Sequence, residues 1–89
     1  MWTKLEYREL DKFDVGQKDE ILYGIVAGLS DEQIAIYAKP EFDWRQMWQI
    51  RLGQEDGLSA EQIAMYANPK FNWEKMMKIR QKLEKGKRK

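Results

Sequence analysis

Apolar and polar residues follow one another along this chain with the spacing of amphipathic helices. On the longer segments apolar residues fall three or four positions apart, as Trp44, Met47 and Ile50 do, so they share one face of a helix with 3.6 residues per turn. Six such segments succeed one another, alternately short and long. The pattern therefore predicts an all-α fold, with helices over 3–10, 15–27, 30–38, 43–55, 59–67 and 72–85.

The pattern also repeats itself with a period of 29 residues. Residues 28–56 and 57–85 are identical at 16 of 29 aligned positions. A fixed period of about 20–50 residues is typical of stacked supersecondary units that cannot bury their apolar faces alone. We therefore expect tandem two-helix repeats, stacked as a short solenoid or a compact helical bundle. The single domain would consist of a degenerate repeat 1–27, repeats 28–56 and 57–85, and a basic tail 86–89.

The predicted helices begin and end at residues suited to those places. Four residues are natural N-caps: Ser30, Asp43, Ser59 and Asn72. The two serines are each followed three positions later by glutamine, which completes a capping box. Gly57 and Gly86 follow the long helices and suit the left-handed conformation that commonly ends a helix.

Composition narrows the function classes. The 89 residues contain no cysteine and no histidine, which removes disulfides, thiolate nucleophiles and the commonest general base and metal ligand. The sequence has no glycine-rich phosphate loop, zinc spacing or nucleophile elbow. We expect no catalytic, metal-binding or cofactor-binding residues, and so no enzyme. Because we also find no apolar run of about 20 residues and no secretory signal, we expect a cytoplasmic protein.

Large apolar side chains on the long helices divide into two groups. Trp44, Met47, Trp73 and Met76 recur at the same place in both repeats, and we expect them in the core between repeats. A second group is not required for capping or packing, and it is accompanied by arginines of the kind found at interface hot spots. It gives the predicted partner-binding residues, for which burial at the edge of the stack is the alternative: Trp48, Arg51, Met77, Arg80 and Arg45.

Charge is distributed unevenly. Residues 1–56 carry 7 Lys or Arg and 12 Asp or Glu, whereas residues 57–89 carry 9 and 3. The basic end is the candidate for an alternative function, binding of nucleic acid. Glu74 and Glu84 interrupt it, so its lysines are expected on several helix faces. The candidate residues are Lys75, Lys78, Lys82, Lys85, Lys87 and Arg88. The opposite charges of the two ends also allow weak head-to-tail association of an otherwise monomeric chain.

The repeated phrase Gly-Leu-Ser-x-Glu-Gln-Ile-Ala-x-Tyr-Ala-x-Pro-x-Phe-x-Trp-x-x-Met resembles a short tandem helical repeat of bacterial and mobile-element proteins. The resemblance covers most of the chain and implies a helical-repeat fold, but it brings no established activity. It suggests a protein–protein interaction module. In its most specific version the chain is a small phage- or mobile-element-encoded inhibitor or adaptor that acts on a host nuclease or defence protein.

A more local resemblance concerns residues 28–35, which are similar to the Gly-Leu-Ser-x-x-Glu-Ile-Ala stretch of LuxR-type helix-turn-helix domains. It implies that 43–55 and 72–85 are recognition helices. Such helices usually open with polar residues that read bases. Here the first opens with Phe42-Asp43-Trp44, an acid between two large rings. Protein binding is therefore the main expectation, and a helix-turn-helix-like nucleic-acid module is the alternative.

Overall fold

The computed structural model describes residues 11–87, and this part of the chain is all-helical. Its helices are α2 (Val15–Val26), α3 (Asp31–Tyr37), α4 (Trp44–Glu55), α5 (Ala60–Ala64) and α6 (Trp73–Lys87). These are five of the six helices that the pattern predicts; the helix expected over 3–10 lies outside the described residues. The main difference is in α5, which ends at Ala64 rather than at residue 67.

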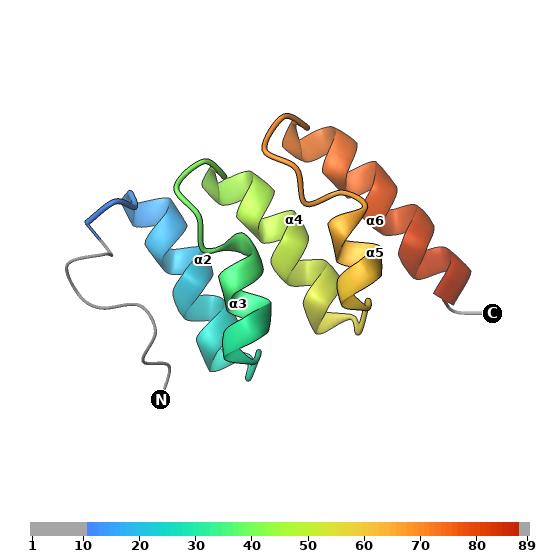
Figure 1. Ribbon diagram of the computed structural model, residues 1–89, viewed down its shortest axis with the longest axis horizontal. Coiled ribbons are helices and arrows are strands. Elements are labelled where there is room, and N and C mark those ends of the chain that lie inside the picture. Colours follow the sequence, from blue (N-terminus) through green and yellow to red (C-terminus); the bar gives the residue numbers. More distant parts are fainter. Residues whose placement is uncertain (1–10, 88–89) are drawn as a thin grey trace.

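The helices form two layers (Figure 1). The long helices α2, α4 and α6 lie side by side, with α4 packed against both others, and the short helices α3 and α5 cover one side of them. The molecule is elongated along the direction in which the long helices follow one another, with extents of 42 × 26 × 17 Å. None of the helices described between residues 11 and 87 combines the length and apolarity that crossing a bilayer requires.

Side-chain caps fix the helix starts where the sequence predicts them. In a capping box the N-cap side chain accepts a hydrogen bond from the backbone three residues on, and the side chain there returns one to the N-cap amide. Four reciprocal boxes are present, in Asp14–Gln17, Ser30–Gln33, Asp43–Gln46 and Ser59–Gln62. Asn72 caps α6 by accepting a 2.8 Å hydrogen bond from the Lys75 amide.

The C-terminal ends of α2 and α4 have the same backbone conformation. Gly28 and Gly57 both have φ of 87°, in the left-handed region that favours glycine. After each glycine a leucine amide donates back into the helix, from Leu29 to Gly24 at 3.1 Å and from Leu58 to Gly53 at 3.0 Å. The apolar side chain of such a leucine normally packs on the end of the helix and seals the turn.

The same turn was expected at Gly86, and this expectation is wrong. The helix α6 continues through Gly86 to Lys87. The physical reason lies in the next residue, because Lys87 stands where Leu29 and Leu58 stand in the earlier copies. Without an apolar side chain to pack on the helix end, the left-handed turn is not stabilised, and the glycine keeps the helical conformation.

The core lies between the two layers. Met47 and Met76 have no exposed surface, as the sequence predicts, and neither have Tyr37 and Tyr66. The expectation of a core position is wrong for Trp44, which is 38% exposed.

Trp73 is only half-buried, so neither tryptophan fills the core as expected. The Trp44 ring rests on the backbone at Gly16, where an added β-carbon would lie 2.9 Å from it. The large rings without exposed surface are instead those of Tyr37, the last residue of α3, and Tyr66, two residues beyond α5.

Corresponding residues make corresponding contacts between successive helices. The Tyr37 hydroxyl donates to the Glu20 carbonyl at 2.7 Å, and the Tyr66 hydroxyl donates to the Gln49 carbonyl at 2.8 Å. The amide group of Gln17 likewise donates to the carbonyls of Pro40 and Phe42, and that of Gln46 to the carbonyls of Pro69 and Phe71. Each capping glutamine therefore also holds the loop that leads to the next long helix.

Candidate binding surfaces

Two of the predicted partner-binding residues, Arg51 and Arg80, are engaged within the molecule. The Nε of Arg51 donates to the Glu20 carboxylate at 2.8 Å, and its terminal nitrogen pairs with Glu55. Arg80 donates in the same way to the Gln49 side chain at 2.9 Å and pairs with Glu84.

Only 13% and 11% of the Arg51 and Arg80 side chains are exposed. Each guanidinium joins its own long helix to the preceding one. Their first role is therefore to fix the spacing of α2, α4 and α6.

The outer side of α4, away from the short helices, carries an aromatic cluster. The rings of Trp44 and Trp48 lie with centroids 6.4 Å apart and planes 33° apart. The guanidinium carbon of Arg45 lies 4.8 Å from the centroid of the Trp44 ring, within the range of a cation–π interaction. Trp44 and Arg45 are exposed and Trp48 is half-buried. The cluster thus combines rings that residues 11–87 leave partly exposed with a cation that already stacks on one of them.

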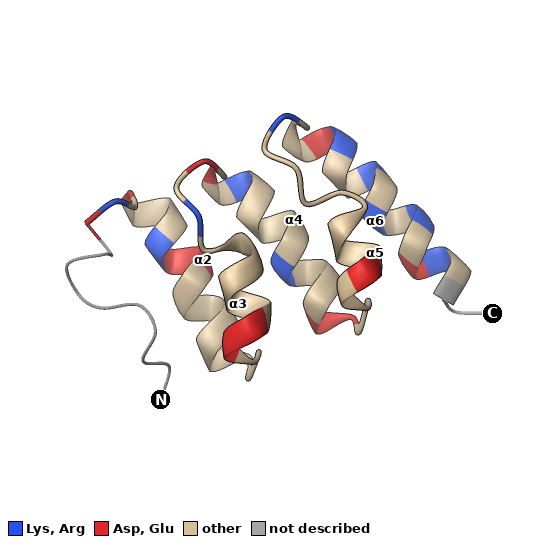
Figure 2. Cartoon of the chain, in the orientation of Figure 1, with Lys and Arg blue, Asp and Glu red and all other residues tan. Residues whose placement is uncertain are grey.

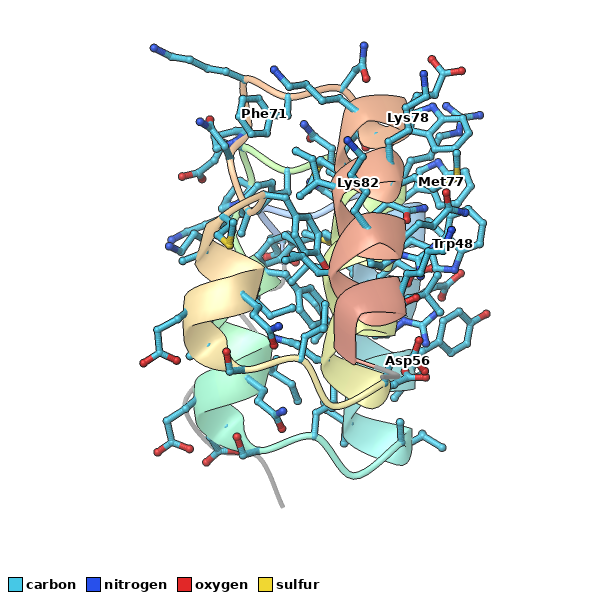
Figure 3. The ribbon with its side chains drawn as sticks, turned by 90° about the vertical axis from the view of Figure 1, so that its right-hand side faces the viewer. Trp48, Asp56, Phe71, Met77, Lys78 and Lys82 are labelled. Atoms are coloured by element: carbon cyan, nitrogen blue, oxygen red, sulfur yellow. The ribbon has the colours of Figure 1, made fainter. Side chains whose placement is uncertain are left out.

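Neighbouring helices extend this cluster. Met77 occupies on α6 the place that Trp48 occupies on α4, and Figure 3 shows both residues on the same side of the long-helix layer. Tyr23 on α2 is 49% exposed, and its ring centroid lies 5.4 Å from the guanidinium carbon of Arg51. We call the set of Tyr23, Trp44, Arg45, Trp48 and Met77 the outer aromatic face.

Three members of the outer aromatic face, Arg45, Trp48 and Met77, are among the residues that the sequence predicts to bind a partner. Trp44 and Tyr23 are not. Trp44 was assigned to the core because it recurs as Trp73 in the second repeat. Tyr23 lies in the degenerate first repeat, at a position where the later copies have Leu52 and Gln81. Its aromatic character was the available signal, because large rings close to arginines are typical of interfaces.

The lysines of α6 do not scatter over several faces as expected. Lys75, Lys78, Lys82 and Lys85 follow one another by three, four and three residues, which places them within an arc of about 80° on an α-helix. All four are exposed, and Figure 2 shows the basic residues along α6. We call them the α6 lysine strip.

The α6 lysine strip lies at the C-terminal end of the row of helices. Figure 3 looks onto this end and shows Lys78 and Lys82 on the near side of α6. Three of the strip lysines, with Gln81, line a shallow hollow on α6. The remaining candidates for nucleic-acid binding are not placed, because the Lys87 side chain and all of Arg88 lie outside the described residues.

Burial raises the pKa of the Tyr37 and Tyr66 phenols. Burial, together with the neighbouring Asp56 carboxyl group, raises the pKa of Glu84. Among the residues described, no group of three or more acidic, cysteine or histidine side chains is arranged to hold a metal ion.

Comparison of the chain with protein-family models, with curated proteins and with solved structures finds no match.

Proposed function

We propose that this chain is a non-catalytic protein-binding module that recognises a protein partner through the outer aromatic face. The observation that carries the proposal is the pair of Trp44, which is 38% exposed, and Trp48, which is half-buried, with their rings tilted against each other on α4 and Arg45 over the Trp44 ring. Complete burial of a large aromatic side chain removes about 150–250 Å² of surface from water. Because both rings are already partly buried, a partner that covered them would bury the part of that apolar area that is still exposed.

The composition of the outer aromatic face favours a protein over other partners. Tryptophan, tyrosine, methionine and arginine are the residue types enriched at protein interfaces, where a few of them supply most of the binding energy. Arg51 is held by Glu20 and Glu55, and its guanidinium group contacts the ring of Tyr23, which is a member of this face. A surface whose side chains are already held in place loses less entropy when it binds.

We further propose that the helices are two-helix repeats stacked as a short solenoid. The contacts of Tyr37 with Glu20 recur, shifted by 29 residues, between Tyr66 and Gln49. The ion pair of Arg51 with Glu55 recurs in the same way in the next copy. This arrangement explains why the outer aromatic face spans several helices, since equivalent positions of neighbouring units lie side by side.

The test compares captured proteins from a cell lysate for three forms of the full chain. The wild type and the control Met65→Ala should retain the same partner, because Met65 is 61% exposed but lies in the short-helix layer. The double variant Trp48→Ala/Met77→Ala should lose it. With the purified partner, we expect the affinity of the double variant to fall by about 30-fold or more, as for loss of a hot spot of about 2 kcal/mol.

Two results would contradict the proposal. Equal capture by the double variant and the control would show that the outer aromatic face does not bind. Recovery of nucleic acid without protein would show that protein is not the partner. The identity of a captured protein also tests the finer version, inhibition or adaptation of a host nuclease or defence protein, which is supported only by the resemblance of the repeat.

A further inference from the structure

On each of α2 and α4, three positions either form hydrogen bonds with the segment that follows or leave room for its tyrosine. On α4 the first position is Gln46, whose amide holds two carbonyls of the next loop. The second is Gln49, which accepts hydrogen bonds from Tyr66 and Arg80. The third is Gly53, whose missing side chain leaves room for Tyr66. The corresponding residues on α2 are Gln17, Glu20 and Gly24, with the same roles.

On α6 all three of these positions are lysine. Shifting Gln46, Gln49 and Gly53 by 29 residues gives Lys75, Lys78 and Lys82. The Lys82 side chain stands where the hydroxyl of a further tyrosine would have to come. Another unit therefore cannot dock on α6 as α5 docks on α4, and this face is left to solvent or to a different partner.

Closing the row of helices does not by itself explain why every replacement is basic. A solvated outer face requires polar residues, and a mixture of charges satisfies that requirement. Lys85 adds a fourth positive charge. It corresponds, by the shift of 29 residues, to Asp56, which directly follows α4. Within residues 11–87 none of these four lysines forms an ion pair, and Glu84 on the same helix is bound to Arg80. Glu74 is exposed beside Lys75 and Lys78, so the strip is a net positive surface with one acidic neighbour in its first turn.

We propose that the α6 lysine strip binds the phosphate backbone of nucleic acid. Its four lysines span eleven residues of a helix, and ten steps of about 1.5 Å place the first and last about 15 Å apart, so they can follow a row of phosphates. A protein partner fits this surface less well, because protein interfaces are depleted in lysine and rely on aromatic or arginine anchors. The strip contains neither, and the ring beside it, Phe71, is half-buried with the Lys75 ammonium group 4.1 Å from its centroid.

This inference goes beyond the protein-binding function and uses a different surface. Lysines that contact phosphates position a protein on nucleic acid without reading its sequence. The α6 lysine strip contains no asparagine or arginine that would reach base edges. Binding should accordingly be tolerant of sequence and strongly dependent on salt.

The experiment measures the fluorescence anisotropy of a labelled DNA duplex of mixed sequence, and of a labelled single strand, titrated with the full chain at several salt concentrations. For the duplex, four phosphate contacts predict a slope of log affinity on log salt of about −3.6. The variant Lys78→Glu/Lys82→Glu should lose at least about tenfold in affinity at low salt, because it reverses two charges of the strip.

The matched control is Lys18→Glu/Lys39→Glu, which changes the net charge equally at two exposed lysines outside α6. It should keep most of the affinity, and circular dichroism should show that both variants fold. Failure of the wild type to bind at low salt, or equal losses in both variants, would overturn the proposal. So would equal affinity for poly-glutamate, which would indicate a general anion site. The variant Trp48→Ala/Met77→Ala should bind the duplex as the wild type does, which separates this proposal from the protein-binding one.

Discussion

The hydroxyl group of Tyr66 fills the space that a side chain at position 53 would need. A β-carbon built on Gly53 would lie 2.2 Å from the hydroxyl oxygen, far inside any van der Waals contact. Tyr37 and Gly24 form the same pair, at 2.1 Å. A glycine inside a helix costs about 1 kcal/mol relative to alanine. These two glycines are explained by the close approach of Tyr37, the last residue of α3, and Tyr66, two residues beyond α5, whose hydroxyl groups donate to the backbone of α2 and α4.

The first prediction concerns Gly53→Ala. Helix propensity alone would stabilise the chain by about 1 kcal/mol, but the added methyl group displaces Tyr66, and such overpacking costs about 1–3 kcal/mol. Because that displacement also weakens the Tyr66 hydrogen bond, we expect a net loss of about 1–2 kcal/mol in unfolding free energy, measured by urea denaturation. The control is Gly86→Ala, also helical but with no atom within 4 Å of the added carbon. It should be neutral or stabilise by up to about 1 kcal/mol.

The second prediction tests whether the tyrosine hydroxyl is the cause. Tyr66→Phe removes the atom that the alanine methyl group would meet, at the cost of one hydrogen bond, about 1 kcal/mol. In the Tyr66→Phe background, Gly53→Ala should therefore cost less than it does in the wild type, by about 1 kcal/mol. Strictly additive effects in this double-mutant cycle would place the strain elsewhere, at Leu58 or Ile63.

The third prediction is a pH dependence. Burial raises the pKa of the Tyr37 and Tyr66 phenols above their ordinary value of about 10. Since the folded state holds these protons more tightly than the unfolded state, the stabilisation is complete below about pH 10. It is lost as the pH rises further, by about 1.4 kcal/mol per pH unit for each phenol.

Comparison of the wild type with Tyr37→Phe/Tyr66→Phe isolates this effect, because deprotonation of lysines affects both proteins. The difference in unfolding free energy should narrow or reverse between about pH 9 and pH 11. A difference that stays constant over this range would contradict the assignment of buried, neutral phenols.

Much of the fold follows from local chemistry that a sequence displays. Capping boxes act within four residues, so Ser30 and Ser59 mark the starts of their helices without knowledge of the rest of the chain. Gly57 ends its helix as predicted. Gly86 does not, because the turn depends on the residue that follows, and Lys87 cannot supply the apolar contact that Leu58 supplies.

The candidate surfaces were less predictable, because they depend on distances between helices. The sequence predicts Arg51 as an interface residue, because its partner Glu20 lies 31 residues away and on another helix. The ion pair with Glu20 that buries Arg51 becomes visible only in the structure. Trp44 reads as core because it repeats, yet it lies on the outside. The role of Lys82 becomes visible only when its counterpart Gly53 is seen under a tyrosine.

The fourth prediction separates the core from the outer aromatic face at two adjacent residues. Met47 has no exposed surface, so Met47→Ala should cost about 2–5 kcal/mol. Trp48 is half-buried, and Trp48→Ala should cost less than about 2 kcal/mol, although its side chain is larger. Chemical denaturation of both variants measures the difference. Comparable losses would mean that Trp48 serves packing, and would count against its role in binding a partner.

The fifth prediction compares the same position inside the row of helices and at its end. Gln46 is 5% exposed; it donates to the carbonyls of Pro69 and Phe71 and accepts a hydrogen bond from the Asp43 amide at 2.8 Å. Gln46→Ala leaves these groups without their partner and should cost about 2–3 kcal/mol. Lys75 occupies the corresponding place on α6, and its side chain makes no hydrogen bond to a loop within residues 11–87. Lys75→Ala loses only the cation–π contact of its ammonium group with the Phe71 ring and should cost no more than about 1 kcal/mol. If both substitutions lowered the unfolding free energy by the same amount, the hydrogen bonds of Gln46 to the next loop would contribute nothing measurable to stability.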